Sequence, residues 1–268
     1  MANTFFLYKH FWINNDVPHL QKEISISECK NLLKQGGVAI RNTYQFDIPK
    51  ETSYWYVIKD SFFGMDELSS KVRNMIRKSL KIYDIRRIDV REIKIIGYDI
   101  FIAAQKSYAI KCKVMTNEEY IALMDSYEKD ESKEFWGVYN KETGEAVAVS
   151  INTVKDNCCE YNTLKALPQA LHNNTYPYYG LIYEMNRYYL DERKLLNVND
   201  GALTLTEHSN IQPFLENKFR FRKAYCKLQI IYVWWFKLIV KVIYPFRKIV
   251  PFLNVKSILR LEEYRRNC

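Results

Sequence analysis

The chain has 268 residues, of which 48% are hydrophobic, and this is enough to bury the core of one large domain or of a domain with an appendage. Disordered, collagen-like and low-complexity classes are excluded, since 8 glycines and 7 prolines stand against 21 tyrosines and 14 phenylalanines. The net charge is +9, but residues 217–268 carry 13 basic and 2 acidic residues, so the rest of the chain sums to −2. The positive excess is a C-terminal property, which favours a local anionic partner there and argues against nucleic acid as the partner of the whole chain.

Helices and strands alternate over the first 90 residues. Residues 27–37 carry a serine cap and a glycine stop, which predicts a short helix. Two strands are expected at 38–46 and 54–58, which are rich in β-branched and aromatic side chains. Residues 66–82 place apolar side chains at helical spacing and basic side chains between them, so a cationic amphipathic helix should precede a strand at 85–90.

The middle of the chain predicts paired helices and then an antiparallel meander. A helix is expected at 95–109, and a second at 117–127, capped by Thr116 or Asn117. The segments 135–139 and 146–154 flank a polar turn and form a hairpin. A further strand follows near 159–164.

Helices and strands then alternate to the end of the main domain. We expect a loop at 168–177, a helix at 178–192, a strand at 195–198, a helix at 210–218 and a strand at 221–231. This order predicts the α+β class, with a mixed, mainly antiparallel sheet flanked by helices.

Two segments resemble the GNAT-type N-acyltransferase fold. Phe135–Tyr139 with Gly144–Ala148 is similar to the hairpin of that superfamily, and Ser209–Phe221 is similar to its asparagine-led last helix and the aromatic residue that follows. The second segment is nearer the Fem-type aminoacyltransferase-like branch. The resemblance implies acyl-CoA or a related acyl donor as co-substrate. It divides the chain into an N-terminal α/β portion (1–84), an acyltransferase domain (85–232) and a basic helical tail (233–268).

Two positions depart from the GNAT pattern. The stretch Tyr176–Gly180 has one glycine where these enzymes place a Gly-rich turn that holds the donor pyrophosphate at a helix N-terminus. The tyrosine acid near the last helix is absent, since Leu215 and Glu216 occupy its neighbourhood.

Candidate site residues come from the polar clusters near the expected cleft. Asp200-Gly201 and Glu207–Asn210 form the densest cluster, and His208, which titrates near neutral pH, is the candidate base. Each candidate also has a structural interpretation, as a loop histidine, a helix cap, an exposed glutamate or a core aromatic. The candidates are His208 and Glu184 for catalysis, and Tyr178, Tyr179, Gly180 and Asn210 for binding substrate or cofactor.

Other chemistries lack a motif. The four histidines and six cysteines show no metal-ligand spacing, so no metal is expected, and the cysteines are interpreted as structural. No P-loop, GxSxG or GxGxxG motif is found. The basic helix near 71–81 could hold phosphates of a donor, a lipid carrier or RNA, or form a solvated face.

Residues 228–253 are the one membrane candidate. Lys237 and Lys241 interrupt the apolar run, which disfavours a spanning helix. Lys237, Lys241, Tyr244 and Lys248 share one helical face beside aromatic bulk, a pattern typical of a helix in a headgroup interface, although a core-packing helix with water-facing lysines fits it equally. Pro245 should end this helix.

The sequence thus predicts an N-acyltransferase that modifies an amine of a sugar or peptide during cell-envelope or surface-polysaccharide synthesis. The start of the chain has no signal-peptide pattern, so a cytoplasmic protein is expected, with residues 233–268 on an anionic membrane surface at the inner face. The alternative is a non-catalytic binding or scaffold protein that retains the acyltransferase fold.

Overall fold

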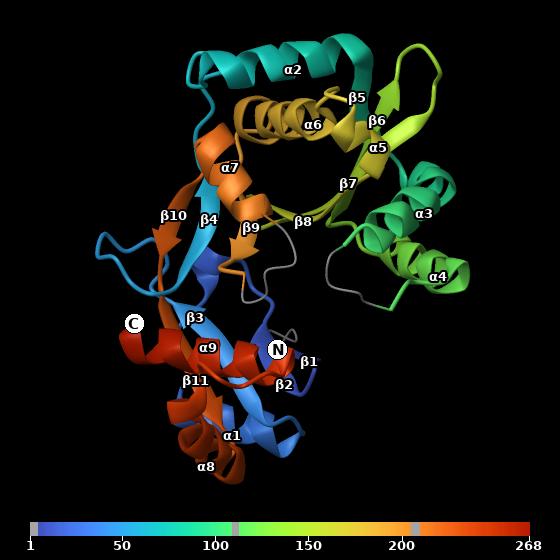
Figure 1. The fold of residues 1–268 in the computed structure, drawn as a ribbon. Coiled ribbons are helices and arrows are strands. Elements are labelled where there is room, and N and C mark those ends of the chain that lie inside the picture. The colour runs from blue at the N-terminus through green and yellow to red at the C-terminus, as the bar shows by residue number, and fades with distance from the viewer. Residues whose placement is uncertain (1–4, 109–112, 205–209) are drawn as a thin grey trace. The chain divides into compact units, whose positions relative to one another are not determined.

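The computed structural model describes residues 5–108, 113–204 and 210–268, and the chain divides into two compact units (Figure 1). Unit 1 combines Met1–Val57 and Ala202–Glu207 with Lys223–Cys268, and unit 2 combines Ile58–Gly201 with His208–Arg222. This division differs from the three segments expected from the sequence, because the C-terminal residues return to the N-terminal segment.

A seven-stranded sheet carries unit 2, in the order β10-β4-β9-β8-β7-β6-β5. Strands β5 to β8 pair as an antiparallel meander, and β8 pairs parallel with β9. The boundary between the units falls within β4 and β10. The strands are β4 (Trp55–Lys59), β5 (Tyr83–Ile88), β6 (Lys133–Asn140), β7 (Ala146–Lys155), β8 (Cys158–Ala166), β9 (Asn197–Ala202) and β10 (Arg222–Tyr225).

Helices cover both faces of the meander. On one face α3 and α4 bury Ile93, Tyr120 and Met124 against Phe135 and Ile151 of the sheet, and α6 packs on the other face, beside α2. Of the two expected caps of α4, Thr116 is confirmed, and it forms a capping box with Glu119, because each side chain accepts a hydrogen bond from the other residue's backbone N–H. The helices are α2 (Ser70–Ile82), α3 (Val90–Lys106), α4 (Asn117–Glu128), α5 (Pro168–His172), α6 (Pro177–Asn186), which continues as the π-helical η2 (Arg187–Glu192), and α7 (Ile211–Phe219).

A buried tyrosine ties η2 to the sheet. The Tyr189 hydroxyl accepts hydrogen bonds from Trp136 Nε1 at 3.0 Å and from Asn152 Nδ2 at 3.2 Å. It donates to Glu134 Oε2 at 2.9 Å. Tyr189 is fully buried, so these bonds satisfy a hydroxyl that would otherwise lower the stability of the fold. The polar groups of Glu134, Trp136 and Asn152 on this face of β6 and β7 therefore have a structural role.

Unit 1 contains a four-stranded sheet in the order β1-β2-β3-β11. Strand β11 pairs antiparallel with β3, and β2 pairs parallel with it. The elements are β1 (Phe5–Tyr8), β2 (Phe11–Asn14), η1 (Pro18–Leu20), α1 (Ile26–Lys34), β3 (Ala39–Tyr44), β11 (Lys227–Tyr232), α8 (Trp234–Ile243), η3 (Tyr244–Phe246) and α9 (Leu253–Asn267).

Three expectations are corrected here. The single strand expected at 221–231 is two strands in different sheets, and between them the N–H of Cys226 donates to the Tyr54 carbonyl at 3.1 Å. Residues 168–172, expected as loop, form α5. The cap of α1 is Ser25, which forms a capping box with Glu28, and not Ser27.

A buried carboxylate fastens α9 to β11. Glu262 accepts hydrogen bonds from Tyr232 OH at 3.0 Å, from Arg265 Nε at 2.9 Å and Nη2 at 2.7 Å, and from Arg266 Nε at 2.8 Å. Although burial alone would raise the pKa of Glu262, the two arginines and the tyrosine lower it to about 2. We call these four residues the Glu262 clamp.

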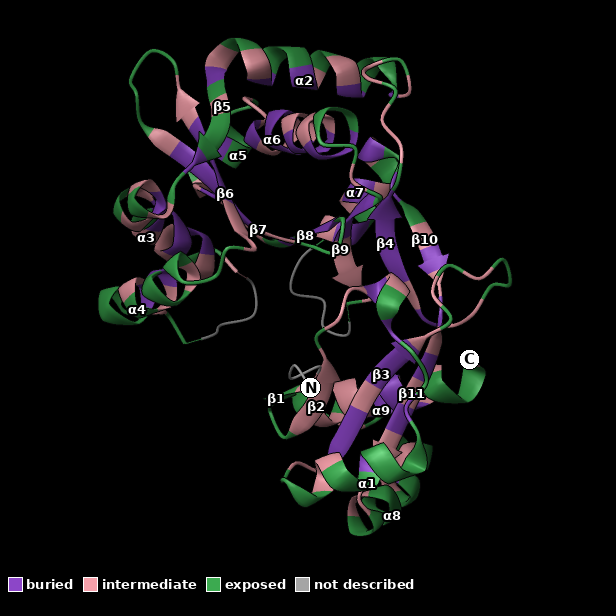
Figure 2. Cartoon of the chain, turned by 180° about the vertical axis from the view of Figure 1, so that it is seen from behind, coloured by how far each residue is buried: buried purple, intermediate pink, exposed green. Residues whose placement is uncertain are grey.

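Helix α8 exposes an apolar face. Phe236 packs on the ring of Phe11, and Val240 is buried, so one side of α8 covers unit 1. Trp234, Leu238 and Val242, spaced four residues apart, lie on the opposite side and are 76, 55 and 68% exposed. Figure 2 shows α8 largely in the green of exposed residues. Helix α8 ends before Pro245, as expected, and within the described residues no helix is both long and apolar enough to cross a membrane.

Candidate active site

Strands β8 and β9 separate in the middle of the unit 2 sheet. They pair over three positions, the last joining Glu160 to Asn199. Beyond that point β8 continues to Ala166 and β9 to Ala202. Beyond Glu160 and Asn199, the backbone groups that would join β8 to β9 in a continuous sheet are therefore not paired between these two strands.

A row of polar residues crosses the sheet at this point. Each residue of this row is the direct partner of the next across the sheet: Lys133 of β6 pairs with Thr153 of β7, Thr153 with Glu160 of β8, and Glu160 with Asn199 of β9. Directly paired residues have their side chains on the same face of a sheet. A β-bulge of β8 at Asn162 brings a fifth polar residue beside them.

A series of hydrogen bonds joins these side chains and ends at the carboxylate of Glu160. Lys133 Nζ donates to Thr153 Oγ1 at 2.7 Å, and Thr153 Oγ1 donates to Asn162 Oδ1. Desolvation by the surrounding protein raises the pKa of Glu160, against the charge of Lys133 and a hydrogen bond from Asn162, which lower it. Burial also lowers the pKa of Lys133, against the charges of Asp130 and Glu160, which raise it.

A second carboxyl group lies on the next strand. Asp200 follows Asn199 on β9, and Gln212 of α7 donates to its backbone carbonyl at 3.3 Å. Burial raises the pKa of Asp200 to about 7, with a hydrogen bond from Gln212 opposing the shift and the charge of Glu160 adding to it. A Cβ atom at Gly201 would lie 3.5 Å from Glu160 Oε1, so the Glu160 carboxylate reaches across to β9.

This pair can move a proton near neutral pH. A carboxyl group with a pKa near 7 is present in both protonation states there, which is the condition for an efficient general acid or base. The two acids come from neighbouring strands at the separation, and we name Glu160, Asp200, Lys133 and Asn162 the β8–β9 acid cluster.

The predicted residues of α6 lie in contacts between elements. Tyr179 is part of an aromatic group with Phe214 at 5.1 Å and Phe219 at 5.8 Å between ring centroids. Tyr178 is partly buried, and burial raises the pKa of its hydroxyl. Glu184 accepts hydrogen bonds from Arg187 one turn later, with Oε2 at 3.0 Å from Nε and 2.9 Å from Nη2.

Gly180 is required by packing between helices. A Cβ atom there would lie 2.4 Å from Ser79 Oγ and 2.5 Å from Ile85 Cδ1. The space beside Gly180 is therefore filled by side chains of α2 and β5, which approach its backbone closely.

Of the two remaining candidates, His208 lies outside the described residues. Asn210 is exposed and occupies the N-cap position of α7, where its side chain makes no cap hydrogen bond. Neither observation tests a role in catalysis or binding.

The start of α6 fits a pyrophosphate poorly. Pro177 has no N–H group, and the N–H of Tyr179 bonds to the Tyr176 carbonyl at 3.0 Å. Lys78 Nζ of α2 lies over the Tyr176 ring, 5.7 Å from its centroid. This end of α6 thus offers one lysine and few free donors where GNAT-type enzymes have a Gly-rich turn.

Among the described residues, no group of three or more His, Cys, Asp and Glu side chains could hold a metal ion. The five described cysteines are free thiols, and four of them are buried. Desolvation raises the pKa of Cys159 well above its usual value, as expected for a structural thiol.

Comparison with known proteins identifies the fold. No family model matches the chain, and no curated protein matches its sequence. The structure is similar to FemX, with TM-score 0.54 and 10% identity over 74% of this chain and 73% of that protein. The chain has a GNAT-like acyltransferase fold with Fem-like neighbours.

Two further structures extend the comparison. L-PGS from Bacillus licheniformis has TM-score 0.53 and 12% identity, over 96% of this chain and 84% of that protein. The PaiA N-acetyltransferase from Thermoplasma acidophilum, solved with coenzyme A, has TM-score 0.35 and 12% identity, over 43% of this chain and 76% of that protein. The similarity to FemX and L-PGS confirms the expected fold.

Proposed function

We propose that this GNAT-like chain is an N-acyltransferase whose reaction takes place at the β8–β9 acid cluster. The observation that carries the proposal is the Asp200 carboxyl group, which has a pKa near 7 and interacts electrostatically with Glu160 of the neighbouring strand where β8 and β9 separate. Acyl transfer to an amine needs a group that removes a proton from nitrogen and a group that protonates the departing thiolate or alkoxide.

One carboxyl group can serve both steps. Asp200 accepts the proton as the amine nitrogen attacks the acyl carbon, and it returns a proton to the leaving group as the bond to the donor breaks. Glu160, held by Asn162, stabilises the positive charge that develops on the nitrogen. His208 remains a second candidate for the base.

For substrates, we propose acyl-CoA or a related acyl donor and an amine of a sugar or peptide in cell-envelope or surface-polysaccharide synthesis. The GNAT-like fold supports this donor class. The poor fit of the α6 N-terminus to a pyrophosphate favours donors held elsewhere, so the leaving group is best determined by experiment.

The test is an assay of amide formation by mass spectrometry. The purified chain is incubated with an acyl thioester (acetyl-CoA or a longer acyl-CoA) or an aminoacyl ester, each with an amino sugar or a lysine-containing peptide. We expect one pairing to give an N-acyl product, and the Asp200→Asn variant to give none. No product and no thermal shift with any donor would contradict the proposal.

The second candidate function is a non-catalytic binding protein on the same fold. It is favoured by the start of α6, where Pro177 and the filled space at Gly180 leave little room for a donor phosphate. Binding of an amino sugar or peptide without product in the assay above would support it.

We also propose that the chain works in the cytoplasm, at the inner face of an anionic membrane, through its C-terminal residues. Helix α8 supports this because its core-packing side uses Phe236 and Val240 while Trp234, Leu238 and Val242 project to the other side. Lys237 and Lys241 flank that apolar side, and both are exposed.

Replacing Trp234, Leu238 and Val242 with serine is expected to weaken co-sedimentation with phosphatidylglycerol-containing vesicles by tenfold or more, since buried apolar area is lost. The matched control replaces Phe63, Ile95 and Leu196, which are similarly exposed in unit 2. Equal vesicle binding by the α8 variant and the wild type would refute docking by this helix.

A further inference from the structure

A cationic cavity lies beside the exposed apolar residues of unit 1. Its volume is about 280 Å³, close to the lower end of small-ligand sites, at about 300 Å³. The residues that line it come from the segment after η3 and from α9, and they are Arg247, Lys248, Lys256, Leu259, Arg260 and Glu263. Four cations and one carboxylate thus surround the cavity.

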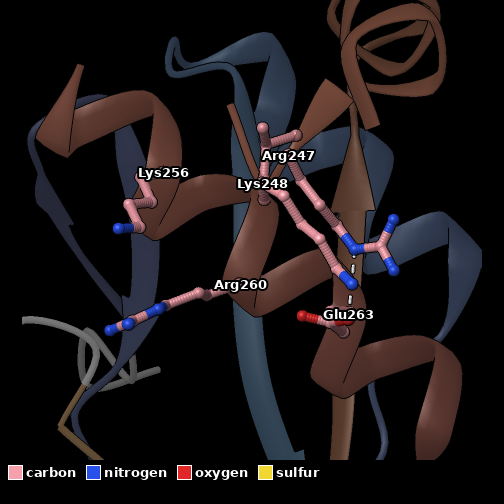
Figure 3. A pocket seen from close by; sticks show the side chains of 6 residues that line it. Arg247, Lys248, Lys256, Arg260 and Glu263 are labelled. Carbon is pink, nitrogen blue, oxygen red and sulfur yellow. Dashed lines mark hydrogen bonds and ion pairs between the residues drawn. The ribbon is translucent and has the colours of Figure 1, made fainter. Parts of the chain in front are cut away.

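The cationic side chains of the cavity differ in how they are held: Arg247 is bonded to other residues, whereas two lysines are exposed. Arg247 Nε donates to Glu263 Oε1 at 3.1 Å, and its guanidinium lies over the Tyr244 ring at 4.5 Å from the centroid. Lys248 and Lys256 are exposed, and neither forms an ion pair within the described part of the chain. In Figure 3, Lys256 and Arg260 extend on one side of α9 while Lys248 reaches toward Glu263.

This charge balance suits a phosphate. The single carboxylate is already bonded to Arg247, so the ammonium groups of Lys248 and Lys256 are left as charged donors in the cavity. A phosphate group would supply oxygen acceptors to these donors, and Leu259, which is buried, closes the cavity with an apolar side chain.

The surroundings indicate what the phosphate is attached to. The same segment exposes Phe246, Ile249, Phe252 and Leu253, with Ile249 and Phe252 at 76 and 70% exposure. Large apolar side chains beside a cationic cavity complement a phosphate carried by an acyl chain, because headgroup and hydrocarbon lie next to each other at a bilayer surface.

We propose that this cavity binds the phosphate headgroup of an anionic lipid. The inference rests on the proposed membrane docking and adds a defined headgroup site to it. It does not depend on the acyl-transfer reaction, so a failed acylation assay leaves it standing.

The test compares two pairs of lysines with equal charge loss. Lys248→Ala/Lys256→Ala removes two cavity lysines, and Lys237→Ala/Lys241→Ala removes two exposed lysines of α8. Co-sedimentation is measured with phosphatidylcholine vesicles that contain about a quarter phosphatidylglycerol, a composition that supplies the surface potential of an anionic leaflet. We expect the cavity pair to lower the affinity about tenfold and the α8 pair to lower it no more than about threefold, with thermal unfolding of both variants unchanged.

Four outcomes would overturn the proposal. Equal loss by both pairs would show that charge attracts the protein diffusely, without a headgroup site. Full binding by the cavity pair would exclude the cavity from membrane contact. A soluble phosphate source is tested with glycerol phosphate at millimolar concentration in the absence of vesicles, and saturable binding of it to the wild type but not to the cavity pair would exclude a lipid requirement. Loss of vesicle binding by the α8 serine variant alone, with the two lysine pairs unchanged, would leave membrane docking intact and refute the headgroup site.

Discussion

Replacing Asp200 with asparagine is expected to lower kcat/KM for amide formation by about 10²–10⁴-fold at pH 8, the usual effect of removing a general base. In the wild-type protein kcat/KM should rise with pH through about 7, as the Asp200 carboxyl loses its proton. The rise should be absent in Asp200→Asn. Rate measurements from pH 5 to 9 with the donor found in the assay above check this.

Glu160→Gln tests the coupling within the acid cluster. The negative charge of Glu160 raises the pKa of Asp200, so its removal should move the rise in kcat/KM to lower pH. A variant that lost activity without this movement would place Glu160 outside the proton transfer. Asp191→Asn, which changes an exposed ion pair with Lys194 in unit 2, is the matched control and should leave the profile unchanged.

Stability shows whether the Asp200 variant is folded. A carboxyl group whose folded-state pKa is raised contributes stability that is fully present below the unfolded-state pKa of 3.8 and is lost as the pH rises through about 7. Asp200→Asn should therefore equal the wild type near pH 4 and exceed it at pH 8, by up to about 4 kcal/mol. A variant that is inactive and also less stable at pH 8 would refute the base assignment.

The second large effect is expected at the Glu262 clamp. Glu262→Gln should lower the free energy of unfolding by about 2–3 kcal/mol at pH 7, less than for a fully buried ion pair because Arg265 and Arg266 are 37 and 41% exposed. The folded-state pKa of Glu262 is depressed to about 2, so its stabilisation is present above 4.5 and is lost as the pH falls through about 2. Urea unfolding at pH 7, 4 and 3 should show the difference shrink.

Glu263→Gln is the control for the clamp. Glu263 is the next residue and is 37% exposed, and its ion pair with Arg247 is worth no more than about 0.5 kcal/mol. Equal destabilisation by the two variants, or a Glu262 effect that persists undiminished at pH 3, would contradict the assignment of the stability to the buried charge.

Much of the unit 2 fold was predictable because its signals are local. The Thr116 cap, the alternation at 135–139 and the helical spacing at 66–82 each depend on residues within one element. These segments form α4, β6 and α2 in the structure, and the order of elements led to the GNAT-like fold.

The acid cluster was harder to predict because it depends on register. Glu160 becomes a partner of Thr153, and Thr153 of Lys133, only when three strands pair with a bulge at Asn162. In the sequence Glu160 is a single glutamate after two cysteines, with no local pattern that marks it. Asp200 was within the polar cluster near the expected cleft, but its raised pKa depends on burial that no local pattern reports.

The division into units depended on long-range pairing as well. Nothing local indicates that β11 pairs with β3, because their partners Lys227 and Tyr44 are far apart in the sequence. The break at Cys226 also interrupts what reads as one continuous β-rich segment.

The pairing of β3 with β11 imposes an order on biosynthesis. Synthesis proceeds from the N-terminus, so all strands of the unit 2 meander leave the ribosome before β11 exists. Strand β3 pairs with β2 on one edge, but its other edge has no partner until β11 is made. The nascent N-terminal segment therefore presents an unpaired strand edge for most of the time that synthesis takes, and such an edge is a site at which chains can associate wrongly.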